Sequence, residues 1–139
     1  MKVLSDTIQL HSEGEGDIID MTTQLSSIVK ESKIKNGTVT IFVSGSTAAV
    51  TTIEYEPGLV HDFPEMLSRI VPRDIDYEHD NTWHDGNGHS HVRSSLIGPS
   101  ITIPIVQGKL TLGTWQQVVL LEMDTRSRNR TVILQLIGE

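Results

Sequence analysis

The C-terminal third of the chain constrains the fold most, because apolar and polar residues alternate there over several short runs. Alternation with a period of two is typical of β-strands that bury one face. Ser100–Val106 alternates, and Lys109–Leu112 returns after a Gln107-Gly108 turn. Trp115–Met123 and Thr131–Ile137 form two further runs that are rich in apolar residues. Pro104 cannot donate to a sheet ladder, so it predicts a sheet edge or a bulge in the first run.

Upstream, alternation and β-branched residues predict three more strands, at Thr7–His11, Thr38–Val43 and Val50–Tyr55. A helix is expected from an N-cap at Asp20 to just before Asn36, because apolar residues recur on one helical face.

A second helix is expected from a capping box at Asp62 and Glu65 to Pro72. The segment Val92–Ile97 fits either a short helix or a strand. Six or seven strands with two helices predict an α+β fold. We expect a single β-dominated domain over residues 1–139, an antiparallel sandwich with two main helices.

The composition excludes several functions. The chain has no cysteine, which rules out disulfides, thiolate zinc sites and a cysteine nucleophile, so any metal must use imidazole and carboxylate ligands. A net charge of -7 argues against general nucleic-acid binding. No apolar run approaches the roughly 20 residues of a membrane span, and no signal peptide is evident. We therefore expect a cytoplasmic protein with neither nucleic acid nor membrane as a partner.

Histidine is concentrated in one short segment, since four of the six histidines fall between His79 and His91. If extended, His89 and His91 would point to the same side and bind one metal, with His79 or His84 as a further ligand. Asp80 or Asp85 could orient an imidazole. The alternative is a solvated polar loop. His11 and His61 stand alone and are expected to be structural.

Other polar and aromatic residues are weaker candidates. Arg126, Arg128 and Arg130 fall in a predicted hairpin turn, where a solvated turn is favoured over a phosphate site. Arg93 would share a face with the two histidines of an extended segment and is the better anion contact. The two tryptophans, at positions 83 and 115, either line a pocket or pack in the core.

Several motifs occur together in one order along nearly the whole chain. They are Thr47-Ala48-Ala49, Glu54, Pro57 and His61-Asp62, then Tyr77-Glu78-His79-Asp80, then Ser90 to Leu96 with Gly98 and Ser100, then Gly113-Thr114-Trp115-Gln116 and the terminal Gly138-Glu139. In this combination the chain resembles the YjbQ-like family, also called the secondary thiamine-phosphate synthase family. The resemblance implies a compact β-rich α+β subunit, a homotrimer, and an activity that joins a pyrimidine pyrophosphate to a thiazole phosphate.

The resemblance also implies a site. It carries catalytic roles onto Glu54, Asp62, Asp80 and Arg93, and it adds His79 and His91 to a histidine set that also contains His84 and His89. A divalent metal, Zn²⁺ or Mg²⁺, is expected with a small phosphorylated molecule as substrate. The chain has Gly45-Ser46 where many members have a His-Thr pair. The alternative function is a non-catalytic metal- or small-ligand-binding protein that uses the same histidines.

Overall fold

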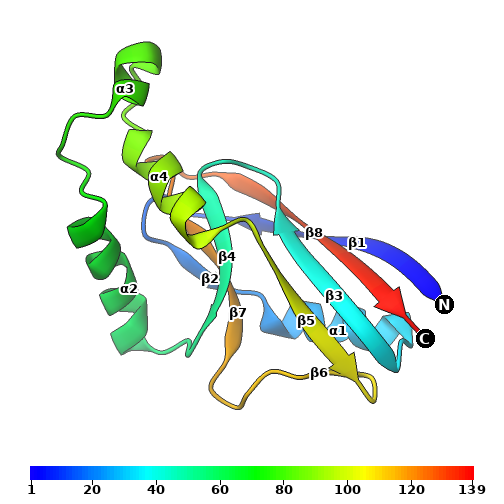
Figure 1. Ribbon diagram of the computed structural model, residues 1–139. Helices are drawn as coiled ribbons and strands as arrows, with labels where there is room; N and C mark the ends of the chain where they lie inside the picture. The colour runs from blue at the N-terminus through cyan, green and yellow to red at the C-terminus, as the bar shows by residue number, and fades with distance from the viewer.

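The computed structural model describes residues 1–139, which form eight strands and four helices (Figure 1). The strands are β1 (Lys2–His11), β2 (Ile18–Asp20), β3 (Asn36–Val43), β4 (Ala48–Ile53), β5 (Ser100–Val106), β6 (Lys109–Leu110), β7 (Gln117–Glu122) and β8 (Asn129–Gly138). The helices are α1 (Thr22–Ser32), α2 (Pro57–Ile70), α3 (Glu78–Trp83) and α4 (Gly88–Ile97). None of the helices has the length and hydropathy needed to span a membrane.

The strands form two antiparallel sheets that enclose the main core. One sheet has the order β1-β8-β3-β5-β6 and the other β2-β7-β4. Ile41 and Leu134 from the larger sheet meet Leu120 from the smaller sheet, and Leu25 of α1 belongs to the same buried cluster. The α+β architecture with antiparallel sheets is therefore confirmed.

A second, smaller cluster lies on the other side of the three-stranded sheet. There Leu67 and Phe63 of α2 and Ile97 of α4 pack with Ala49 and Leu121. The molecule is thus layered as large sheet, core, small sheet and helices. The outer face of the large sheet carries no helix, as Figure 1 shows.

Alternation along β8 explains why the large sheet has one buried and one open face. Val132, Leu134 and Leu136 are buried, and the residues between them point outward. We call the outward positions of four paired strands the outer sheet face. It comprises Val3, Ser5, Thr7, Gln9, His11, Asn36, Thr38, Thr40, Phe42, Ser100, Thr102, Pro104, Val106, Asn129, Thr131, Ile133, Gln135 and Ile137. Pro104 lies at the sheet edge, as predicted, because β6 pairs with β5 only at Ile105 and Val106; beyond that pairing the Pro104 carbonyl accepts from the backbone N–H of Thr111 at 3.2 Å.

Several expected boundaries are wrong. Two additional helices, α3 and α4, occupy the histidine-rich segment, and α4 resolves the ambiguity of Val92–Ile97 in favour of helix. Helix α2 begins at Pro57 instead of Asp62, because the Glu56 carboxylate accepts hydrogen bonds from the backbone N–H groups of Gly58 and Leu59 and caps the first turn. Asp20 precedes the N-cap of α1, although its side chain accepts from the Thr22 N–H.

Candidate functional site

The histidine-rich segment folds back on itself as two short helices. His84, with φ 55°, ends α3 in the left-handed region, and Gly86, with φ 67°, continues the reversal. The Asp80 carboxylate accepts from the backbone N–H of Gly88 at 2.8 Å, which ties α3 to the start of α4. A Cβ atom added at Gly88 would overlap the Cβ of Tyr77, so this close approach requires glycine.

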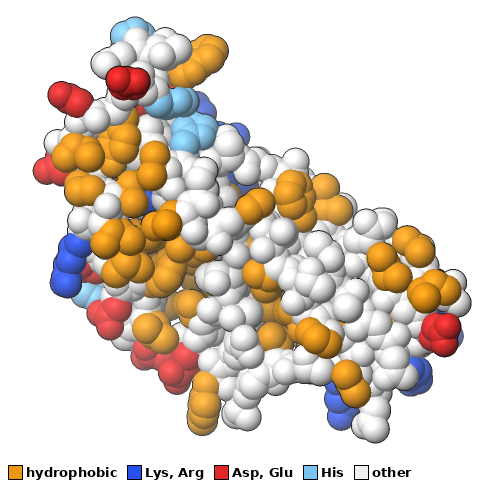
Figure 2. All heavy atoms as spheres, in the orientation of Figure 1, with side chains coloured by type: hydrophobic (Ala, Val, Ile, Leu, Met, Phe, Trp, Pro, Cys, Tyr) orange, Lys and Arg blue, Asp and Glu red, His pale blue; other side chains and the backbone are white.

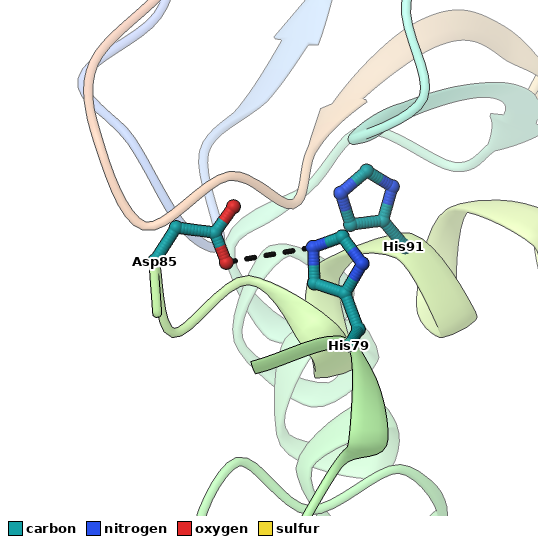
Figure 3. A group of neighbouring side chains, drawn as sticks. All are labelled: His79, Asp85 and His91. Carbon is teal, nitrogen blue, oxygen red and sulfur yellow. Dashed lines mark ion pairs between the residues drawn. The ribbon is translucent and has the colours of Figure 1, made fainter. Parts of the chain in front are cut away.

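This reversal brings His79 of α3 next to His91 of α4 (Figure 3). Asp85, from the turn that joins the two helices, lies beside His79. One ligand atom from each residue lies within 4.8 Å of the others. The imidazole centroids are 4.4 Å apart, and Nε2 of His79 lies 3.4 Å from Oδ1 of Asp85. The same Nε2 atom is buried and makes no hydrogen bond. This unpaired nitrogen thus faces a carboxylate and lies close to a second imidazole.

Local hydrogen bonding keeps the Asp85 carboxylate ionised. The backbone N–H of Asn87 donates to Oδ1 of Asp85 at 3.1 Å. This bond is the main cause that holds the pKa of Asp85 below its ordinary value, and the nearby His79 imidazole acts in the same direction. The cluster therefore offers an anionic oxygen beside two imidazoles.

Asn87 joins this turn to the connection between β7 and β8. Its buried amide donates to Oδ1 of Asp124 at 3.3 Å and accepts from the backbone N–H of Thr125 at 3.1 Å. Asn87 also accepts from the Ser90 hydroxyl at 2.9 Å inside α4. A single amide thereby fixes the histidine turn against the sheet end.

Beside the cluster lies a hollow of about 280 Å³ that has no apolar residue in its lining. We call it the arginine hollow. Its lining comprises Ser44, Gly45, Ser46, Thr47, Asp85, Asn87, His91, Asp124, Arg126, Arg128, Asn129 and Arg130. Three arginines against two aspartates leave the lining with one formal positive charge, and two cluster residues, Asp85 and His91, belong to it.

Arg130 is the most buried of these arginines. Its Nε donates to Oε2 of the fully buried Glu122 at 2.8 Å, and its Nη2 donates to the Thr47 hydroxyl at 2.8 Å. Its Nη1 atom points toward Gly45, where an added Cβ would stand only 2.8 Å away. The guanidinium is therefore held rigidly from behind and presents one nitrogen to the hollow.

The extended H-x-H geometry predicted for His89 and His91 is wrong, because both residues lie in α4. Residues two apart on a helix point to different sides. His89 is fully buried, and its Nε2 contacts Glu15. Arg93, one helical turn on, follows His89 into the interior, where Nε donates to the Val71 carbonyl at 3.0 Å and Nη1 lies 3.6 Å from Glu15.

The remaining predicted site residues lie outside the cluster. Asp80 supports it from behind through its bond to Gly88, and His84 is an exposed residue at the end of α3. Glu54 is exposed after β4, and Asp62 is exposed on α2 with its Oδ1 3.1 Å from His61 Nδ1. None of these four residues lines the arginine hollow.

Two structural expectations about arginine and tryptophan also fail. The segment from Arg126 to Arg130 is not a simple solvated hairpin, because β7 and β8 belong to different sheets and Arg130 is 3% exposed. Trp83 and Trp115 are 69% and 72% exposed, so neither packs in the core.

The sequence did not predict three buried or partly buried acidic residues that form ion pairs with the histidine and arginine side chains of the site. Glu15, Glu122 and Asp124 are ordinary acidic residues by sequence, and their partners lie elsewhere in the chain. The sequence does contain one indication that Glu122 and Asp124 are buried, because Glu122 ends an otherwise apolar run and Asp124 follows it two residues later. A buried carboxylate needs a cation, and three arginines follow within eight residues of Glu122.

The cluster has the donor set of a transition-metal or zinc site. Zn–N and Zn–O bonds of about 2.1 Å in a tetrahedron place ligand atoms roughly 3.4 Å apart. The His79–Asp85 separation of 3.4 Å meets this requirement. His79, Asp85 and His91 would supply three of the four ligands of such an ion. Mg²⁺ fits less well, because it prefers six oxygen ligands.

Comparison with known proteins places the whole chain in one family. The family profile described as UPF0047 protein YjbQ-like matches residues 6–139. A UPF0047 protein from Methanothermobacter thermautotrophicus is 34% identical over 100% of this chain and 95% of the relative.

Two crystal structures have the same fold. A YbjQ-like protein from Sulfolobus solfataricus P2 has a TM-score of 0.92 at 33% identity, with 99% of each chain covered. A hypothetical protein from Aeropyrum pernix K1 has a TM-score of 0.85 at 33% identity, with 100% of each chain covered. The sequence match and the shared fold agree along the full chain, which therefore belongs to the UPF0047 YjbQ-like family.

Proposed function

We propose that the protein is a metal-assisted enzyme acting on a small phosphorylated molecule, with His79, Asp85 and His91 as the metal ligands. The observation that supports this most is the position of the cluster at the wall of the arginine hollow, with His91 and Asp85 belonging to both. Cation ligands and phosphate donors thus converge on one space.

The charges of the hollow support a phosphate group more strongly when a cation is present. One formal positive charge on the lining is modest, because Asp124 and Asp85 oppose the arginines. A divalent cation at the cluster would supply charge to the oxygens of a departing phosphate or pyrophosphate group. Arg126 and Arg128 would then orient that group, and Nη1 of Arg130 would donate to it.

The specific reaction we propose is the one that the family resemblance implies, thiamine-phosphate synthesis. A ring nitrogen of the thiazole phosphate forms a bond to the exocyclic carbon of the pyrimidine, and the carbon–oxygen bond to pyrophosphate breaks. The electron pair leaves with the pyrophosphate oxygen. The residues of the hollow therefore need to stabilise negative charge on the leaving group, which is what guanidinium donors do.

The second candidate is a non-catalytic binding protein that holds a metal or a small anion in the same place. The burial of Arg130 against Glu122 also fits this candidate, because a rigid hydrogen-bond donor can hold an anion without any reaction. The two functions differ in turnover alone.

Steady-state assays with the two thiamine precursors and Zn²⁺ or Mg²⁺ test the proposal. We expect thiamine phosphate to form, and we expect His91→Ala and Arg126→Gln to lower the rate by at least about tenfold. His61→Ala is the control, because the exposed His61 and its partner Asp62 lie outside both the cluster and the arginine hollow, so this variant should retain full activity. Metal bound to the protein without any thiamine phosphate at high enzyme concentration would favour the binding protein.

A further inference from the structure

A second basic hollow lies at the opposite end of the molecule, between the C-terminal end of α1 and the β5–β6 turn. It has a volume of about 620 Å³ and is lined by four lysines, Lys30, Lys33, Lys35 and Lys109. We call it the lysine hollow. Figure 1 places α1 and β6 far from α3 and the top of α4, and Figure 2 shows basic side chains at this lower right end.

The lysines of this hollow carry free charge. Every one of the six arginines of the chain takes part in an ion pair, whereas no lysine does. Four of the five lysines line this one hollow, and no aspartate or glutamate does. In a chain with net charge -7 this concentration creates a local positive potential that solution anions will neutralise.

The rest of the lining indicates what kind of anion fits. The accessible apolar part of the wall comes from the half-buried side chains of Leu110 and Leu112, and Val29 and Ile34 lie buried behind them. Hydroxyl and amide groups of Thr22, Ser26, Gln107, Thr114, Gln116 and Gln117 complete it. An apolar wall beside ammonium groups and neutral donors is typical of a pocket for an organic ligand with a charged end.

We propose that the lysine hollow binds a small molecule that carries two or more phosphate groups on an apolar or aromatic body. Four ammonium groups match the charge of a di- or triphosphate, and lysine is a common phosphate donor. The volume exceeds that of a single phosphate and accommodates the attached body. This site shares no lining residue with the arginine hollow.

A tryptophan provides the readout. Trp115 stands between Thr114 and Gln116, which both line the lysine hollow, and its side chain is 72% exposed. The other tryptophan, Trp83, lies in α3 near the histidine cluster. In a Trp83→Phe protein, a change in fluorescence therefore reports on the lysine hollow alone.

Titration of this protein with ATP and with inorganic tripolyphosphate, checked by calorimetry, tests the proposal. We expect both probes to bind, with ATP tighter than tripolyphosphate because its body contacts the apolar wall. The variant Lys30→Gln/Lys35→Gln/Lys109→Gln should weaken ATP binding at least about tenfold, since each exposed ion pair lost weakens binding by up to about fivefold. Lys33 is left unchanged because its φ of 60° caps α1.

Lys2→Gln is the matched control, because Lys2 is the one lysine outside the hollow, and it should change the affinity less than about twofold. His91→Ala should leave ATP binding intact, which separates this site from the proposed catalytic one. The proposal is overturned by absence of binding at millimolar ATP, by equal losses in the Lys2 and triple variants, or by binding that requires His91. Binding of an acidic polypeptide but of neither probe would also overturn it.

Discussion

Asp124 links the candidate site to the stability of the protein. Its side chain, 1% exposed, accepts from the Thr47 hydroxyl at 3.0 Å, from Asn87, and from Nη1 of Arg128 at 2.8 Å. Burial by itself raises the pKa of this carboxyl, but the bonds from the Arg126 backbone, Thr47 and Asn87 and the Arg128 charge outweigh burial. The pKa therefore lies below its ordinary value.

Asp124→Asn should lower the free energy of unfolding at neutral pH by about 1–3 kcal/mol, because it replaces a fully bonded buried acceptor with an amide that cannot accept all of those bonds. A carboxyl with a lowered folded-state pKa stabilises the fold above the ordinary aspartate pKa of about 3.9. That contribution to stability is lost as the pH falls through the pKa that Asp124 has in the folded protein. The difference between wild type and variant, measured by urea unfolding, should therefore shrink from pH 7 to pH 3. Asp76→Asn, at an exposed position, is the control and should show no such trend.

His91→Ala should reduce bound Zn²⁺ to well below one ion per chain while leaving the fold intact. The change removes one of three ligands, and the half-exposed side chain adds little to the core. His11→Ala should retain the metal. Acid should strip the site of the parent protein, because an imidazole nitrogen that carries a proton cannot coordinate. Equilibrium dialysis with elemental analysis measures the metal content of the parent protein and of both variants. Equal metal content in the two variants would exclude the cluster as the metal site.

The reversal of the chain between α3 and α4 determines whether the cluster forms. Its geometry depends on Gly88, whose backbone approaches Tyr77 too closely for any side chain, and on the Asp80 bond to the Gly88 N–H. This contact holds the start of α4 against α3, while the Asn87 network ties the turn between the two helices to the β7–β8 connection. A small change at Gly88 should therefore move His79 away from His91.

Gly88→Ala is expected to destabilise the protein by about 1–3 kcal/mol, the usual cost of forcing extra volume into a packed site. It should also lower metal affinity, because α3 must shift. Ser95→Ala, at an exposed position of the same helix, is the control and should be neutral or slightly stabilising, since alanine favours helix. Chemical unfolding and metal titration on both variants would show whether stability and binding change together, as this geometry requires.

The sequence predicted the sheets better than the helical segment, for a physical reason. Strand β8 alternates buried and exposed residues, so its period of two is visible locally. Helix α4 buries His89, Ser90, Arg93 and Ser94, which are polar, so its buried face has no apolar stripe to reveal it. The partners that make this face stable, such as Glu15 and Val71, are distant in sequence.

The same distinction applies to the site. His79 and His91 were found from composition, because histidine clustering is a local property. The third member of the cluster, Asp85, was assigned only a supporting role, and His89 was assigned as a ligand, because an extended H-x-H pair and a helical one give opposite side-chain directions. Choosing between them required the backbone conformation, which Gly88 and Asn87 set through contacts outside the segment.

Two surfaces of the protein are left uncovered. The outer sheet face carries no charged residue, although the chain has 21% charged residues and a net charge of -7 (Figure 2). On the opposite side, the helical layer exposes Ile70, Val92 and Leu96 at 55%, 46% and 57%. Elsewhere two negatively charged copies repel each other, but at an uncharged face they can approach.

An uncharged sheet face and a different, apolar patch on the helices favour a ring over a face-to-face dimer. A dimer with twofold symmetry uses the same surface on both copies, whereas a closed ring of three pairs one surface with a different surface of the next copy. We therefore propose that the homotrimer implied by the family resemblance forms by contact of the outer sheet face with the helical layer of a neighbouring copy. Light scattering should then give about three times the chain mass of 15.4 kDa.

Charge substitutions on the two surfaces distinguish these arrangements. Ile133→Lys on the outer sheet face and Leu96→Lys on the helical layer should each yield monomers, because each destroys one half of every contact in the ring. An equimolar mixture of the two variants should give a one-to-one pair, since the intact helical layer of the first variant meets the intact sheet face of the second, and the ring cannot close. Gln24→Lys, at an exposed position of α1, should remain a trimer. If Leu96→Lys assembles like the parent while Ile133→Lys does not, the sheet faces pair with each other. A parent protein that stays monomeric at micromolar concentration would rule out both arrangements.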